Sequence, residues 1–90
     1  MEQKRILIVD DEQDLCEILC YNLTAAGYQA EVVYSAEMAI EKGVAHYDLL
    51  LLDVMMPGMS GFELARQLKG DETTASVPII FLTEIGRAHV

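Results

Sequence analysis

Positive charge is scarce in this 90-residue sequence. Lysine and arginine together number 6, against 15 aspartates and glutamates, which gives a formal net charge of −9 at pH 7. Proteins that bind nucleic acid or anionic membranes present a cationic surface to those partners, and this chain has few residues from which to build one. We therefore expect no direct binding to nucleic acid or membranes, and a cation or a basic protein as the natural partner.

Long apolar runs are also lacking. No run approaches the roughly 18 residues that a membrane-spanning helix needs. Met1 is followed by four polar residues and a short apolar segment, a start that differs from the apolar core of a signal peptide. The sequence shows no repeat, low-complexity stretch or linker. We expect one small cytoplasmic domain with a modest core.

Cysteine is limited to Cys16 and Cys20, which would share one face of a helix. A metal site would need further ligands, and neither His46 nor His89 stands at a ligand spacing from them. A reduced thiol pair beside the core is the better interpretation, so we assign these cysteines no chemistry.

The apolar residues that are present alternate between two patterns. Short, continuous and often β-branched runs are typical of strands covered on both faces. Other segments repeat apolar residues at spacings of three and four, which indicates helices, with Ser35 as an N-cap and Gly27 as a C-cap. The alternation predicts a doubly wound parallel α/β sheet with helices on both faces. The expected strands cover 5–9, 30–35, 48–52 and 77–83, and the expected helices cover 14–26, 36–46 (weakened at Gly43) and 61–69.

Acidic residues end two of the expected strands: Asp10 and Asp11 follow the first, and Asp53 ends the third. In a doubly wound sheet of order 2-1-3-4, ligands bind outside the carboxyl ends of the first and third strands. Three carboxylates there would repel one another unless a cation neutralised them. An all-oxygen site with room for water suits Mg²⁺, so the sequence predicts a magnesium site.

Simpler interpretations exist for the same residues. Asp11 or Asp14 could cap the first helix, and "MPGMSG" could be an ordinary strand-to-helix turn. A cap, however, needs no second carboxylate across the crevice, which favours the metal site. Thr83, at the end of the fourth strand, is either an ordinary β-branched residue or a hydroxyl donor to an anion in the crevice.

Three motifs together resemble the receiver domain of bacterial two-component response regulators: "ILIVDDE", "LLLLDVMMPGMSGFEL" and "VPIIFLT". The resemblance covers residues 4–83 and implies a flavodoxin-like fold. It also implies a role for each matching position: Asp53 as the phosphoacceptor, Asp10, Asp11, Asp53 and the backbone carbonyl of Met55 as Mg²⁺ ligands, and Thr83 as the switch hydroxyl.

The resemblance further implies a phosphorelay function. A sensor histidine kinase would transfer a phosphoryl group to Asp53 with Mg²⁺ bound, and the product would be an acyl phosphate. Such a domain is a phosphoacceptor with Mg²⁺-assisted self-phosphorylation and dephosphorylation rather than an enzyme acting on a separate substrate. The full-length protein would carry an effector, most often a DNA-binding domain, after the receiver.

The end of the chain departs from the family. A complete receiver adds a fourth helix, a fifth strand with a catalytic lysine and a fifth helix, and none of Lys4, Lys42 and Lys69 matches that lysine. A widely used sequencing adapter, read in one frame, encodes "EIGRAHV". We therefore expect 1–83 to be an incomplete receiver domain and 84–90 to be a non-native tail.

Three other functions compete with the phosphorelay interpretation. A degenerate receiver acting only as a protein-binding module would explain the missing lysine. It would not explain why Asp10, Asp11 and Asp53, the Asp trio, are all present. A haloacid-dehalogenase-like phosphatase needs a second carboxylate where this chain has Met55. A flavodoxin-like cofactor carrier needs a glycine-rich phosphate loop where this chain has "DDEQD".

Overall fold

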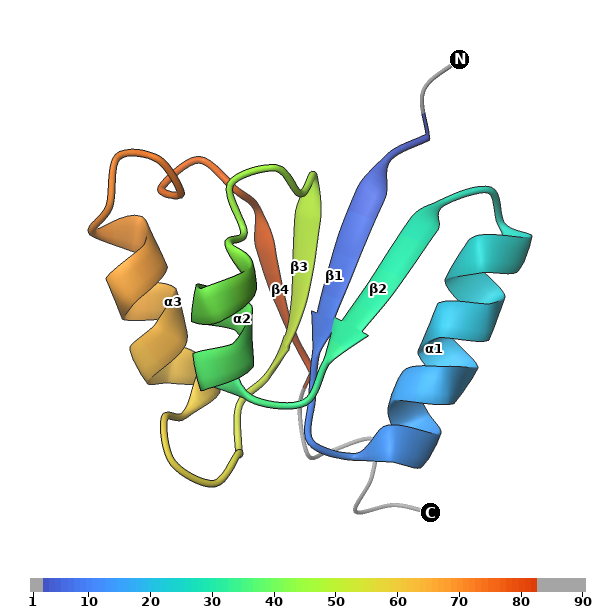
Figure 1. Cartoon of the computed structure of the whole chain (residues 1–90), viewed down its shortest axis with the longest axis horizontal. Helices are drawn as coiled ribbons and strands as arrows, with labels where there is room; N and C mark the ends of the chain where they lie inside the picture. The colour runs from blue at the N-terminus through green and yellow to red at the C-terminus, as the bar shows by residue number, and fades with distance from the viewer. Residues whose placement is uncertain (1–2, 83–90) are drawn as a thin grey trace.

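The computed structural model describes residues 3–82, and in this range strands and helices alternate along the chain. The expected order of elements is confirmed throughout. The elements are β1 (Arg5–Val9), α1 (Gln13–Ala25), β2 (Gln29–Val33), α2 (Ala36–Lys42), β3 (Leu49–Asp53), α3 (Gly61–Lys69) and β4 (Ile79–Leu82) (Figure 1).

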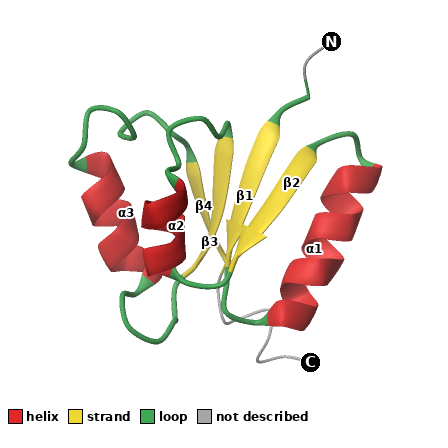
Figure 2. Cartoon of the chain, in the orientation of Figure 1, coloured by secondary structure: helices red, strands yellow, loops and turns green. Residues whose placement is uncertain are grey.

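All four strands belong to one parallel sheet with the order β2-β1-β3-β4. Helix α1 covers one face of the sheet, and α2 and α3 cover the other (Figure 2). The doubly wound α/β fold and its 2-1-3-4 order are therefore as the sequence predicted. Because strand order reverses between β1 and β3, the crevice expected to hold a ligand lies at the carboxyl ends of these two strands.

The strand register places the acidic residues side by side. Val9, the last residue of β1, pairs with Leu52 of β3. Asp10 is the next residue after Val9 and Asp53 the next after Leu52, so the two aspartates reach the same edge of the sheet together. A shift of one residue in this register would turn one of the two carboxylates to the opposite face.

The main hydrophobic core lies between the sheet and the α2–α3 layer. On the other face α1 buries only Cys16 completely, and Ile18, one of the apolar residues at helical spacing in this segment, is 58% exposed. The apolar spacing correctly predicted a helix. Within residues 3–82, however, this single helix covers only part of one face of the four-stranded sheet. Both cysteines are free thiols, as expected. The buried core residues include Leu7, Val9, Val33, Ala36, Ala39, Val44, Leu50, Leu52, Leu64, Leu68 and Val77.

The helix ends follow local chemistry. Ser35 caps α2 as predicted, since its Oγ accepts a hydrogen bond from the Met38 amide at 3.0 Å. The same helix stops at Lys42 rather than residue 46, because Gly43 takes a φ of +83° that ends the helical path. The longest helix, α1, has 13 residues, so within 3–82 none of the helices could serve as a membrane span.

The strand limits differ from expectation by one or two residues. The second strand is Gln29–Val33 rather than 30–35, and the third is Leu49–Asp53 rather than 48–52. The fourth begins at Ile79 rather than 77, because Pro78 has no amide to donate; its carbonyl still accepts from the Leu50 amide at 2.9 Å.

An ion network joins β1, β2 and α2 at the end of the sheet opposite the aspartates. Glu31 accepts from Arg5 at 3.1 Å, from Lys42 at 3.2 Å and from the Tyr47 hydroxyl at 3.0 Å. The Arg5 guanidinium carbon also lies 4.6 Å from the centre of the Tyr47 ring. The hydrogen bond from Arg5 is the main reason that the pKa of Glu31 is lowered, with Lys42 and Tyr47 adding to it.

Replacing Glu31 with Gln tests this network through its pH dependence. The pKa of Glu31 lies below its ordinary value of 4.5 in the folded chain, so its stabilising effect is complete above that pH and is lost as the pH falls through the lower folded pKa. We expect Glu31→Gln to lower the midpoint of urea unfolding at neutral pH, with the difference disappearing in acid. Because these side chains are more than a third exposed, the difference will be small.

The matched control is Glu17→Gln, since Glu17 is exposed on α1 and its side chain has no polar contact within the described range. That variant should follow the wild-type midpoint at every pH. A difference for Glu31→Gln that stays constant from neutral to acidic pH would contradict a role for the Glu31 charge.

Candidate functional site

Three carboxylates meet at the carboxyl end of the sheet. One oxygen from each of Asp10, Asp11 and Asp53 lies within 4.8 Å of the other two, and no other group of three acidic, histidine or cysteine ligands does so within residues 3–82. Asp10 and Asp53 are fully buried, whereas Asp11 is exposed. The site is thus a buried acidic pair with one carboxylate at its opening.

Hydrogen bonds from the chain itself orient the buried pair. Asp10 Oδ1 accepts from the Glu12 amide at 2.9 Å, and Asp53 Oδ1 accepts from the Met55 amide at 3.3 Å. The Cys16 thiol donates to the Asp10 carbonyl at 3.3 Å, which ties α1 to the end of β1. The N-cap residue of α1 is Glu12, whose side chain makes no capping hydrogen bond to the helix, so neither Asp11 nor Asp14 occupies the cap position.

The three carboxylates fit a magnesium ion. Mg²⁺ takes oxygen ligands at about 2.0–2.1 Å, so two ligands on opposite sides of the ion stand roughly 4 Å apart. The observed limit of 4.8 Å is close to that span. Two buried carboxylates also carry a strong mutual repulsion that a divalent cation relieves. Small side-chain rotations or a retained water would complete the coordination.

The loop after β3 runs against the site, and two glycines allow it. The amide of Gly61 donates to the Val54 carbonyl at 3.0 Å and closes the loop. A Cβ atom at Gly61 would overlap the backbone carbonyl of Asp53, so this glycine is needed for space. Gly58 instead has a φ of +76°, which favours glycine for its conformation. Both glycines belong to the "MPGMSG" turn, but Gly61 is required for space and Gly58 for its backbone conformation.

The remaining predicted residues have different outcomes. Thr83 and the 84–90 tail lie outside the described residues. Met55 has an exposed side chain and an amide bonded to Asp53, and its carbonyl as a metal ligand stays a prediction. Lys42 pairs with Glu31, and Lys69 donates to backbone carbonyls of the loop before β4, both at the far end of the sheet.

Sequence reasoning missed the capping box that begins α3. The Ser60 Oγ accepts from the Glu63 amide at 3.2 Å, and the Glu63 carboxylate accepts from the Ser60 amide at 2.9 Å. The hydrogen bond from the Ser60 amide lowers the pKa of Glu63. The S-x-x-E spacing was present in the sequence and could have revealed it. This box fixes where the loop from Asp53 ends and α3 begins.

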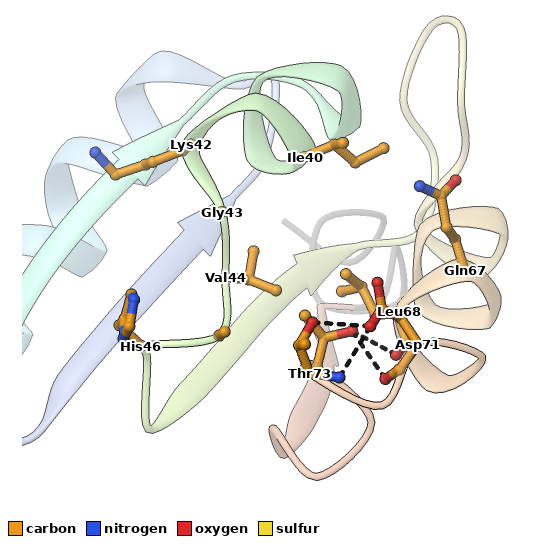
Figure 3. Close-up of a pocket in the computed structure, with 11 residues that line it drawn as sticks. Ile40, Lys42, Gly43, Val44, His46, Gln67, Leu68, Asp71 and Thr73 are labelled. Carbon is orange, nitrogen blue, oxygen red and sulfur yellow. Dashed lines mark hydrogen bonds between the residues drawn. The ribbon is translucent and has the colours of Figure 1, made fainter.

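An open cavity of about 330 Å³ lies at the other end of the sheet, between the C-terminal ends of α2 and α3. In Figure 3 the side chains of Lys42 and His46 extend away from Asp71 and Thr73. The Thr73 amide and hydroxyl both donate to Asp71, at 2.9 and 2.8 Å. Asp71 and Thr73 are thus bonded to each other, and Lys42 is paired with Glu31, so the Asp trio remains the candidate site.

Comparison with known proteins agrees with this geometry. The model of the family described as "Response regulator receiver domain" matches residues 6–89. The phosphate regulon transcriptional regulatory protein PhoB of Pseudomonas aeruginosa is 47% identical over 87 residues, which are 96% of this chain and 38% of that protein. The response regulator ArlR of Staphylococcus saprophyticus is 39% identical over 80 residues, or 88% of this chain and 35% of that protein. The chain thus spans less than half the length of these relatives.

Solved structures show the same fold. The N-terminal domain of a response regulator receiver protein from Methanoculleus marisnigri superposes with a TM-score of 0.86 at 34% identity, covering 91% of this chain and 68% of that one. The response regulator protein TrrA of Thermotoga maritima, in complex with Mg(2+)-BeF, gives 0.82 at 36% identity, covering 94% and 73%.

Replacing Gly61 with Ala tests the close approach of the loop to Asp53. The added methyl group would overlap the Asp53 carbonyl and force the backbone apart, so we expect a loss of about 1–3 kcal/mol in the free energy of unfolding. Gly70→Ala is the control, because its nearest heavy atom would be an ordinary 3.5 Å away. Urea denaturation of both variants measures the contrast, and equal stability of the two would disprove the steric requirement.

Proposed function

The chain belongs to the response regulator receiver domain family, and on that premise we propose that it accepts a phosphoryl group on Asp53 with Mg²⁺ bound at the Asp trio. The observation that carries the proposal is the meeting of the three carboxylates within 4.8 Å, two of them fully buried. A purely structural role would not require two buried carboxylates together, because burying like charges is costly. The similar TrrA structure, titled as a complex with Mg(2+)-BeF, also supports a magnesium site here.

In the proposed reaction, a carboxylate oxygen of Asp53 attacks the phosphorus of a phosphohistidine. The new P–O bond forms as the P–N bond breaks, and the electron pair of that bond returns to the imidazole, which takes up a proton. Bound Mg²⁺ would offset the negative charge shared by the carboxylate and the phosphoryl group. The rigid end of β3 and the Met55 amide hold Asp53 in place for attack, so positioning supplies much of the remaining rate.

The other roles follow the family pattern. Asp10, Asp11 and the Met55 carbonyl would join Asp53 as metal ligands, and the Thr83 hydroxyl would donate to the bound phosphoryl group. Within residues 3–82 no lysine approaches the site in place of the family's catalytic lysine. We therefore expect slow phosphorylation of this chain compared with a complete receiver.

The proposed partner is a sensor histidine kinase, and the proposed setting is the cytoplasm. Both named relatives are much longer than this chain, and PhoB is called a transcriptional regulatory protein. We infer that a full-length form carries a DNA-binding effector. The net charge of −9 makes DNA binding by the receiver segment itself unfavourable.

Intact mass measurement tests the acceptor. The chain is incubated with a small-molecule phosphodonor and Mg²⁺, and we expect a slow gain of one phosphoryl group that is absent in Asp53→Asn, because the amide is not a nucleophile. Asp14→Asn, which changes an exposed carboxylate on α1, should gain mass like the wild type. An equal gain in wild type and Asp53→Asn would rule out Asp53 as the acceptor and favour the binding-module alternative.

Replacing Asp11 with Asn tests the metal through stability. Removing one of three like charges should raise the unfolding midpoint of the metal-free chain, because the repulsion falls. The same change should remove most of the increase in midpoint that added Mg²⁺ gives the wild type, because a ligand that binds only the folded state stabilises it. Thermal unfolding with and without Mg²⁺ measures both effects. An undiminished response to Mg²⁺ in Asp11→Asn would exclude this residue as a ligand.

A further inference from the structure

A side chain on a neighbouring helix holds the loop that follows the acceptor. Glu37 lies in the first turn of α2, and its Oε2 accepts a hydrogen bond from the Met59 amide at 3.1 Å. Figure 1 shows the loop between β3 and α3 passing beside this end of α2. The same carboxylate lies against Gly58, where a Cβ atom would stand 2.9 Å from Oε2. Two neighbouring loop residues therefore contact one charged group.

Helix α2 is a firm base for this contact. Ser35 caps its first turn, and Ala36 and Ala39 are fully buried against the core. The Glu37 carboxylate thus extends from a fixed position. A hydrogen bond from an amide to a charged acceptor is also stronger than one to a neutral acceptor.

The contact with Glu37 restrains the middle of the loop, which the hydrogen bond between its two ends leaves free to move. Its ends are joined by the Gly61–Val54 hydrogen bond, and Met56 is 9% exposed and packs in the core. Gly58 follows Met56 by two residues, and glycine has more conformational freedom than any other residue. By binding the Met59 amide, Glu37 fixes the backbone just after Gly58 and so restricts the path of the segment from residue 55 to residue 59.

We propose that Glu37 is a positioning residue that tethers the β3–α3 loop and thereby presents the Met55 backbone to the magnesium site. The proposal rests on the proposed function for its metal, but the tether is a property of the metal-free chain. Glu37 does not touch the metal or Asp53; it acts through the Met59 amide and the backbone that leads back to Met55.

Amide exchange in the ¹⁵N-labelled 90-residue chain tests the tether without metal. In Glu37→Ala we expect faster exchange of the Met59 amide and a changed resonance for the Met55 amide. Glu37→Gln keeps an acceptor oxygen at the same reach and should preserve both signals. Glu41→Gln makes the same charge change on the same helix, at an exposed side chain with no polar contact in the described range, and should match the wild type.

Titration with Mg²⁺, followed at the Met55 amide, tests the consequence for the site. We expect the Kd of Glu37→Ala to rise about three- to tenfold, the effect of losing one hydrogen bond, and that of Glu37→Gln to stay within about twofold of wild type. An unchanged Kd in Glu37→Ala would overturn the proposal. Equal weakening in Glu37→Ala, Glu37→Gln and Glu41→Gln would overturn it too, because long-range charge would then explain the effect.

The two hypotheses fail separately. If the wild-type chain binds no Mg²⁺, the proposed function fails, and the tether is judged on the Met55 and Met59 amides alone. Unchanged amides in Glu37→Ala would reject the tether even if the wild type binds Mg²⁺ and Asp53 gains a phosphoryl group.

Discussion

The parallel pairing of β1 with β3 is the constraint on which the site depends. It aligns Val9 with Leu52, so the residues that follow them, Asp10 and Asp53, emerge together from a buried sheet. The hydrophobic residues on both sides make a slip in register costly, because it would turn leucines to solvent and a carboxylate into the core. The apolar core thus holds together two charges that repel each other.

Around that pair, the chain restrains its backbone from several directions. The Cys16 thiol links α1 to the end of β1, and the Gly61 amide closes the loop after β3. The Glu37 carboxylate reaches the same loop from α2. Each contact is modest by itself, at about 0.5–1.5 kcal/mol for a typical neutral hydrogen bond and somewhat more for one to a charged acceptor such as Glu37. Together they fix the direction of backbone groups near a site whose chemistry depends on position more than on covalent assistance.

The two faces of the sheet are unequally covered within residues 3–82. Helices α2 and α3 enclose a continuous core, whereas α1 alone leaves Ile18 of its own surface and Ile80 of β4 more than half exposed. The helical period of α1 correctly predicted a helix, yet the period cannot show whether a neighbouring element exists to cover a given position. Exposure is decided by what packs against a helix and not by its own sequence.

The sequence by itself determined the order of elements, the parallel sheet and the identity of the acidic residues, because hydrophobic periodicity and strand-ending aspartates are local signals. It also contained the S-x-x-E signature of the α3 cap. Only the tertiary structure decided that Gly61 must leave room for the Asp53 carbonyl and that Glu37 meets the Met59 amide. These contacts join residues that are 8 and 22 positions apart in the sequence. Whether such residues meet in space depends on strand register and helix packing, which no local sequence pattern encodes.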